Sequence, residues 1–137
     1  MRILQILTIQ PSGLQILSDH GLTFDLQSYP NTIKHIPLLA EKFPKLKMVI
    51  DHIAKPDYLQ NGFAQWSEDM TRLAKYKNVH CKLSGMINEV PFWSTETFKP
   101  YVDHCLGKKE CVAWWLLSPL TCDVVRGLRS VPPDVRQ

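Results

Sequence analysis

Three strand-like segments alternate with helix-like segments between residues 12 and 107, and this alternation constrains the fold more than any other feature of the chain. The predicted strands begin at residues 22, 46 and 79, so successive strands start 24 and 33 residues apart. Each interval also contains one helix-like segment. Strand–helix units of this length are typical of βαβ connections and a parallel sheet. The predicted fold class is therefore α/β.

The three strands are predicted over 22–26, 46–51 and 79–84. The middle one is almost entirely apolar after Lys47, as expected for a parallel strand that is covered on both faces. The helices are predicted from apolar residues at helical spacing, and Ser12 and Asn31 are predicted to cap the first two of them. These helices cover about residues 12–20, 31–43, 63–74 and 95–106.

The regular pattern stops at Gly107. The remaining stretch, 108–137, contains Trp114-Trp115, Pro132-Pro133 and three arginines, but its apolar residues recur with neither helical nor strand periodicity. We therefore divide the chain into an α/β part, 1–107, and a divergent tail, 108–137, which we expect to be poorly ordered or loosely docked.

The composition is that of one soluble globular domain of 137 residues, with 45% hydrophobic residues and a formal net charge of +3. Sixteen basic against 13 acidic residues predict no nucleic-acid partner. No apolar run approaches the roughly 18–20 residues of a membrane-spanning helix, so we expect no membrane partner. The four cysteines form no C-x-x-C pair, and free thiols in the cytoplasm are the expected state.

Candidate site residues follow the carboxyl ends of the predicted strands, where parallel α/β folds collect their functional groups. The middle strand ends in Asp51-His52. An imidazole there can ligate a metal, polarise a carbonyl or move a proton near neutral pH. An equally good interpretation is a helix-capping aspartate beside a packed histidine.

The third predicted strand ends in Lys82-Leu83-Ser84-Gly85. Lys82 can bind an anionic or polyhydroxylated substrate or an oxyanion, or it is an exposed lysine on an edge strand. Ser84 is either a substrate contact or the start of a loop. The sequence contains no H-x-H, no H-E-x-x-H, no zinc-type Cys/His spacing, no nucleotide-binding glycine motif and no G-x-S-x-G.

Three segments, in order and at matching spacing, resemble the amidohydrolase superfamily. They are Gly21-Leu22-Thr23-Phe24-Asp25-Leu26, Val49-Ile50-Asp51-His52-Ile53-Ala54-Lys55-Pro56 with Phe43-Pro44 before it, and Asn78-Val79-His80-Cys81-Lys82-Leu83-Ser84-Gly85. The resemblance is to the branch of sugar-lactone and pyrone-dicarboxylate lactone hydrolases. It covers about Gly13 to Leu106, and Trp66 and Pro100-Tyr101-Val102 also match.

This resemblance implies a (β/α)8 barrel that hydrolyses a lactone or a related C–O or C–N bond. By position in the motifs, His52 matches the catalytic histidine, which ligates metal in metal-dependent members. Lys82 and Ser84 match substrate-binding positions in the same pocket, and Gln27 lies at the corresponding end of the preceding strand. The implied substrate is a small lactone or carboxylate.

Two parts of the family pattern are missing from this chain. The family begins with an H-x-H strand, and it places a catalytic aspartate in a Gly-Ser-Asp-Trp-Pro segment. Here the second region reads Gly107-Lys108-Lys109-Glu110-Cys111-Val112-Ala113-Trp114-Trp115. A complete barrel also takes about 250 residues. We therefore expect a partial TIM barrel of about three central parallel strands, from a truncated or alternatively spliced product.

Three functional hypotheses follow. In the first, the parent protein is a lactone hydrolase with a divalent metal, and this chain, which holds no cofactor, is inactive alone. In the second, the chain is a non-enzymatic isoform that binds a partner, or a second copy of itself, through open sheet edges. In the third, the chain is a complete small α/β binding domain. The lack of a helical or strand pattern after Gly107 argues against this hypothesis.

Overall fold

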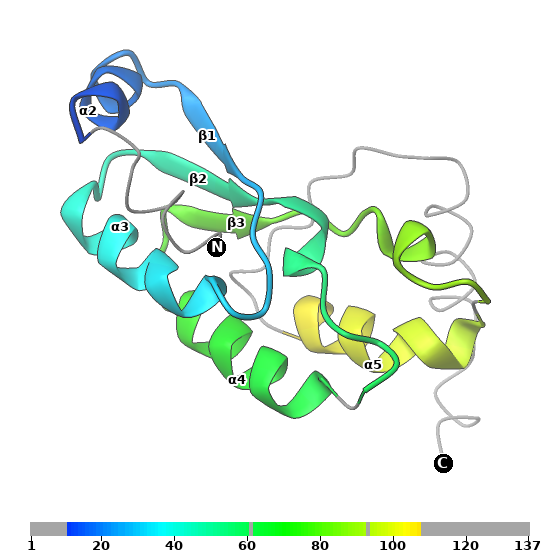
Figure 1. Ribbon diagram of the computed structural model, residues 1–137. Coiled ribbons are helices and arrows are strands. Elements are labelled where there is room, and N and C mark those ends of the chain that lie inside the picture. Colours follow the sequence, from blue (N-terminus) through cyan, green and yellow to red (C-terminus); the bar gives the residue numbers. More distant parts are fainter. Residues whose placement is uncertain (1–10, 61, 93, 108–137) are drawn as a thin grey trace.

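The computed structural model describes residues 11–60, 62–92 and 94–107 (Figure 1). The predicted tail, 108–137, lies outside these residues. The regular elements, in chain order, are α2 (Pro11–Asp19), β1 (Thr23–Leu26), α3 (Ile36–Lys42), β2 (Lys47–Ile50), α4 (Phe63–Leu73), β3 (Val79–Cys81) and α5 (Thr95–Leu106). Short 3-10 turns span η1 (Ile33–His35), η2 (Asp51–Ala54) and η3 (Met86–Glu89). None of the described helices is long and apolar enough to cross a membrane.

The three strands form one parallel sheet in the order β1-β2-β3. Phe24 pairs with Met48, which pairs with Val79, and the next pairs along the same face join Leu26, Ile50 and Cys81. Figure 1 shows α3 and α4 lying along one face of this sheet. The predicted α/β class with a parallel sheet is therefore confirmed, as is the number of strands.

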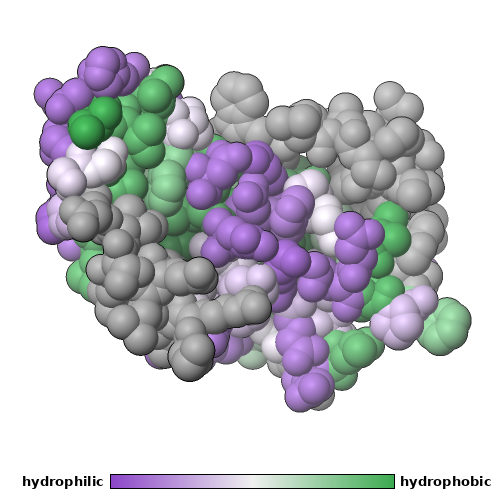
Figure 2. All heavy atoms as spheres, turned by 45° about the horizontal axis from the view of Figure 1, so that its top comes forward, coloured by the Kyte–Doolittle hydropathy of each residue, from purple (hydrophilic) through white to green (hydrophobic). Residues whose placement is uncertain are grey.

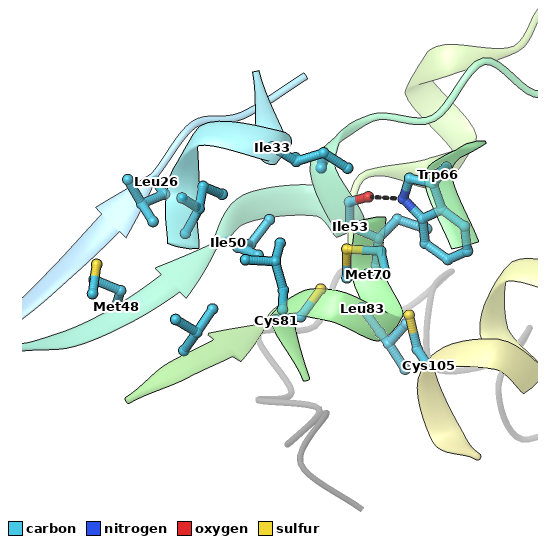
Figure 3. Close-up of a cluster of buried hydrophobic side chains, with 14 of the residues drawn as sticks. Leu26, Ile33, Met48, Ile50, Ile53, Trp66, Met70, Cys81, Leu83 and Cys105 are labelled. Atoms are coloured by element: carbon cyan, nitrogen blue, oxygen red, sulfur yellow. Dashed lines mark hydrogen bonds between the residues drawn. The ribbon is translucent and has the colours of Figure 1, made fainter. Parts of the chain in front are cut away.

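The core lies between the sheet and these helices. Figure 3 shows Leu26, Ile50 and Cys81 of the three strands pointing toward Met70 and Trp66 of α4. These five side chains are buried, and Cys81 is a free thiol, as predicted. The apolar spacing that predicted a helix over about 95–106 is also confirmed, since the buried residues of α5 are Phe98, Tyr101, Val102 and Cys105.

The two predicted helix caps are wrong. Helix α2 already begins at Pro11, so Ser12 lies within its first turn. The second helix begins with η1 after Thr32 rather than after Asn31, and becomes α-helical only at Ile36. The reason is local: the Thr32 hydroxyl donates to the Tyr29 carbonyl and accepts from its amide, both at 2.9 Å, which closes a separate turn first.

The amide of Asn78 links the two loops that lead into β2 and β3. Its Nδ2 group lies 3.1–3.3 Å from the carbonyl oxygens of Ala40, Phe43 and Leu46. In addition, the Met48 amide donates to the Asn78 carbonyl at 2.8 Å. The Asn78 side chain therefore binds carbonyls at the end of α3 and in the loop before β2, while its backbone carbonyl pairs with the second residue of β2.

We expect Asn78→Ala to lower the free energy of unfolding by about 2 kcal/mol, because partly buried carbonyls would lose their donor. Urea denaturation of the purified chain measures this. Asn88→Ala is the matched control, since Asn88 is exposed and its loss should change the stability by less than about 0.5 kcal/mol. Equal effects of the two substitutions would contradict the role given to Asn78.

Candidate active site

A left-handed turn begins two residues after the end of β2 and carries the candidate histidine. His52, Ile53, Ala54 and Lys55 have φ values of 52°, 47°, 60° and 46°. For residues with a side chain this conformation costs about 1–2 kcal/mol each. Four such residues in succession are strained, and strain of this kind persists only where surrounding contacts determine it.

Buried contacts hold the turn in place. The Trp66 indole of α4 donates to the Ile53 carbonyl at 2.7 Å, the dashed line in Figure 3. The Ile53 amide donates to the Lys82 carbonyl at 3.0 Å, which extends the β2–β3 pairing past the end of the sheet. The side chains of Ile53 and Ala54 are fully buried. Hydrogen bonds and burial therefore oppose the cost of the left-handed backbone.

The last residue of the turn joins it to the loop after β3. The Lys55 ammonium lies 2.8 Å from the Glu89 carboxylate of η3 and 5.8 Å from the centre of the Tyr29 ring. The hydrogen bond to Glu89 raises the pKa of Lys55 above its ordinary value. Three strand-end loops therefore meet at Lys55.

His52 contacts the end of the third strand. Its Nδ1 atom lies 2.8 Å from the Ser84 hydroxyl oxygen. Gly85 has a φ of 71°, and a Cβ atom there would come within 2.6 Å of the same Nδ1. Ser84 therefore orients the imidazole by a hydrogen bond, and Gly85 leaves the space that the ring needs.

Lys82 forms an ion triad with carboxylates of the other two strands. Its ammonium lies 2.7 Å from Asp25 and 2.8 Å from Asp51. These hydrogen bonds, to Asp25 and then to Asp51, raise the pKa of Lys82, so it is fully protonated at neutral pH. The side chain is 15% exposed. The triad joins the carboxyl ends of all three strands.

The predicted site residues are thus partly brought together. His52 and Ser84 touch, and Lys82 is linked to His52 through the neighbouring Asp51 and the Ile53 amide. Gln27 directly follows β1 and is exposed. Figure 2 shows hydrophilic residues gathered across the middle of the face that turns forward when the top of Figure 1 is tilted toward the viewer.

A cleft of about 440 Å³ opens between the loops after β1 and β2. Its lining residues were not predicted from the sequence: Tyr29, Pro30, Asn31, Lys55 and Asp57. Two features of the sequence could have indicated this cleft. Lys55 and Asp57 follow His52 within five residues, and Tyr29-Pro30-Asn31 follows the end of a predicted strand.

The donor set of the described residues does not fit a catalytic zinc ion. Such a site typically needs three protein ligands, and within residues 11–60, 62–92 and 94–107 no group of three His, Cys, Asp or Glu side chains could hold a metal. His52 directs Nδ1 to Ser84, and Asp51 holds Lys82. We therefore derive no chemical step through a metal.

Comparison with protein families shows that residues 10–107 match the model of the amidohydrolase family. An L-fucono-1,5-lactonase from Burkholderia ambifaria is 38% identical over 84 residues, which make up 61% of this chain and 29% of the relative. An uncharacterized protein, y4mH, from Sinorhizobium fredii is 31% identical over 95 residues, or 69% of this chain and 32% of the relative.

Two crystal structures of an amidohydrolase from Burkholderia multivorans share the fold. The structure with bound zinc has a TM-score of 0.75 at 17% identity, covering 90% of this chain and 51% of the other. The structure with bound HEPES has a TM-score of 0.72 at 16% identity, covering 89% and 51%. The chain therefore spans about a third of the length of the curated relatives and half of the solved structures, as a partial barrel does.

We expect Gly85→Ala to lower the free energy of unfolding by more than about 2 kcal/mol and to displace the His52 ring, because it combines a positive φ with a steric clash. Urea denaturation measures the first effect and the NMR signals of the His52 ring the second. Gly13→Ala is the control: apart from its chain neighbours and the backbone of its own helix, no atom of the described residues lies within 4 Å of the added Cβ. In a helix this substitution should stabilise by up to about 1 kcal/mol. An unmoved His52 signal in Gly85→Ala would contradict the packing.

Proposed function

This chain belongs to the amidohydrolase family, and on that premise we propose that it is part of a lactone hydrolase that acts on a small sugar lactone or related acid lactone. The relative named L-fucono-1,5-lactonase supports this substrate class. The observation that carries the proposal within the molecule is the His52–Ser84 contact of 2.8 Å at adjoining strand ends. Parallel α/β folds build their active sites at this edge.

In the proposed reaction, His52 is the catalytic residue of this chain. An imidazole can take up or release a proton near neutral pH, and its position at a strand end suits a group that serves the attacking water or the leaving oxygen. Ser84 orients the ring. Because its hydroxyl is engaged by His52, we assign Ser84 to positioning the histidine within a substrate-binding region, rather than to holding the substrate alone.

Lys82 was expected to bind the substrate, and we propose a more indirect role. Its ammonium is shared by Asp25 and Asp51, so its charge is offset by two carboxylates. It would therefore set the position of Asp51, the residue before His52. Gln27, exposed at the end of β1, is the proposed polar substrate contact on the other side of the site.

A second candidate function is partner binding without catalysis. Within the described residues β1 and β3 each pair with β2 alone, and open strand edges accept further strands. Under this hypothesis the chain binds another polypeptide or a second copy of itself. Size-exclusion chromatography over a concentration series tests association with a second copy, because a dimer formed through strand edges would raise the apparent mass as the concentration rises.

We expect the purified chain to hydrolyse no aldonolactone above background. Lactone hydrolysis needs a positioned water, a base and stabilisation of the developing negative charge, and the motif-matched residues supply only the His52 part. A pH-indicator assay over a panel of aldonolactones measures it. Turnover that disappears in His52→Ala but persists in His35→Ala would show that the chain is itself an enzyme.

We also expect the chain to retain no stoichiometric zinc after dialysis, because the motif-matched positions supply one ligand of the three that a catalytic site typically needs. Elemental analysis by mass spectrometry measures the content, with a known zinc enzyme carried through the same dialysis. One tightly bound zinc per chain would point to ligands outside this set, with the cysteines tested first by substitution.

A further inference from the structure

Five exposed lysines lie at the edge of the sheet where the strands begin, opposite the edge that carries His52. They occupy the end of α3, the loop into β2, the first position of β2 and the loop between α4 and β3: Lys42, Lys45, Lys47, Lys75 and Lys77. Figure 1 shows that α3 and α4 both return the chain to the edge where β2 and β3 begin. We call these five residues the lysine cluster.

Hydrogen bonds tie the two loops of the lysine cluster to each other. The Tyr76 hydroxyl, between two of the lysines, donates to the Glu41 carboxylate beside Lys42 at 2.6 Å. The Asn78 side chain bonds to carbonyl oxygens at the end of α3 and before β2. The backbone that carries the lysines is therefore already arranged as one surface before a ligand binds.

The positive charge of the lysine cluster is not neutralised locally. None of its five ammonium groups forms an ion pair with a described residue. Two carboxylates lie near the ends of the neighbouring helices, Asp19 and Glu41, and both accept hydrogen bonds from uncharged side chains. Five positive charges therefore stand against two negative ones at this edge of the described chain.

The distribution of charge favours a short anionic partner over an extended one. Exposed charges interact over about a Debye length, ~8 Å at physiological ionic strength, so a short acidic segment on the cluster meets mainly lysines. Outside the cluster, the described residues include ten acidic and five basic side chains. A long duplex or an anionic membrane would also approach this acidic remainder, which opposes binding.

The side chains around the lysines do not suit stacked bases either. Single-stranded nucleic acids bind on exposed aromatic rings. Tyr76 is half-buried with its hydroxyl bonded to Glu41, and Phe43 is buried. Among the described residues of these two loops, the groups that face solvent are therefore charged rather than aromatic.

We propose that the lysine cluster is a docking surface for an acidic segment of another polypeptide, with several aspartates or glutamates close together. Lysines act as separate point charges, so the surface selects charge density rather than one exact sequence. Because the cluster and His52 lie at opposite ends of the strands, a bound segment leaves the candidate active site open. The proposal is independent of lactone hydrolysis, and it uses side chains rather than strand edges.

The test measures binding of a fluorescein-labelled peptide of about ten glutamates to the 137-residue chain, by fluorescence anisotropy at low salt, ~50 mM. Lys45→Glu combined with Lys77→Glu should weaken binding about tenfold, because two attractions become repulsions. Raising the salt to ~300 mM should weaken binding of the unaltered chain by a similar factor, because exposed charges are screened.

Lys34→Glu is the matched control for Lys77→Glu, since each reverses one charge. Lys34 is exposed, lies in η1 at the other end of α3, and forms no ion pair with a described residue. Lys77→Glu should weaken binding about threefold, and Lys34→Glu by less than about 1.5-fold. If the charge reversals disturb folding, as judged by circular dichroism, Lys45→Gln with Lys77→Gln removes the charge alone.

Equal affinities of Lys77→Glu and Lys34→Glu, or no binding of the peptide at low salt, would overturn the proposal. Tighter binding of a DNA duplex, or of vesicles containing phosphatidylserine, would also overturn it, because the surface would then suit another class of partner. None of these results bears on lactone hydrolysis, which is proposed for residues at the other end of the strands.

Discussion

The left-handed turn from His52 to Lys55 is the constraint on which the rest of this site depends. Each residue in it adopts a backbone conformation that costs about 1–2 kcal/mol, so the turn exists only because other contacts maintain it. The most buried of these is the hydrogen bond from the Trp66 indole to the Ile53 carbonyl. Trp66 is itself fully buried in the core between the sheet and the helices. A residue of the hydrophobic core therefore helps to determine the position of this polar site.

The turn also explains why separate loops converge. Within four residues of left-handed backbone, His52 contacts Ser84 and Lys55 reaches Glu89 and Tyr29. The strained backbone therefore lies where both contacts of the site are made, as strain that surrounding contacts maintain often does. Gly85 completes the arrangement, because no side chain fits against the imidazole.

The sequence predicted the order and type of the helices and strands, but it predicted only part of the candidate site. Helix α5 spans Thr95–Leu106, as its apolar spacing predicted, and the β-branched run before Asp51 became the central strand. These features depend on local periodicity. The pairing of Lys82 with Asp25 and Asp51 depends instead on the register of three strands, and the φ values of the turn depend on Trp66, 13 residues further along the chain. Positive φ at non-glycine residues leaves almost no signal in a sequence, so the cleft was not predicted.

Within the described residues, three side-chain positions fix the place of His52, whereas the proposed hydrolysis also needs other reacting groups. The hydroxyl of Ser84 orients His52, Gly85 leaves space for the imidazole ring, and the buried Trp66 indole holds the next residue of the turn. In a parallel barrel each strand end contributes its own group to a shared centre. Neighbouring strands can therefore fix the geometry of one group without the rest of the barrel, whereas catalysis needs groups from strands that are far apart around it. Order at His52 and activity at His52 are for this reason separate properties, and within the described residues the first rests on the loop after β3 and on α4.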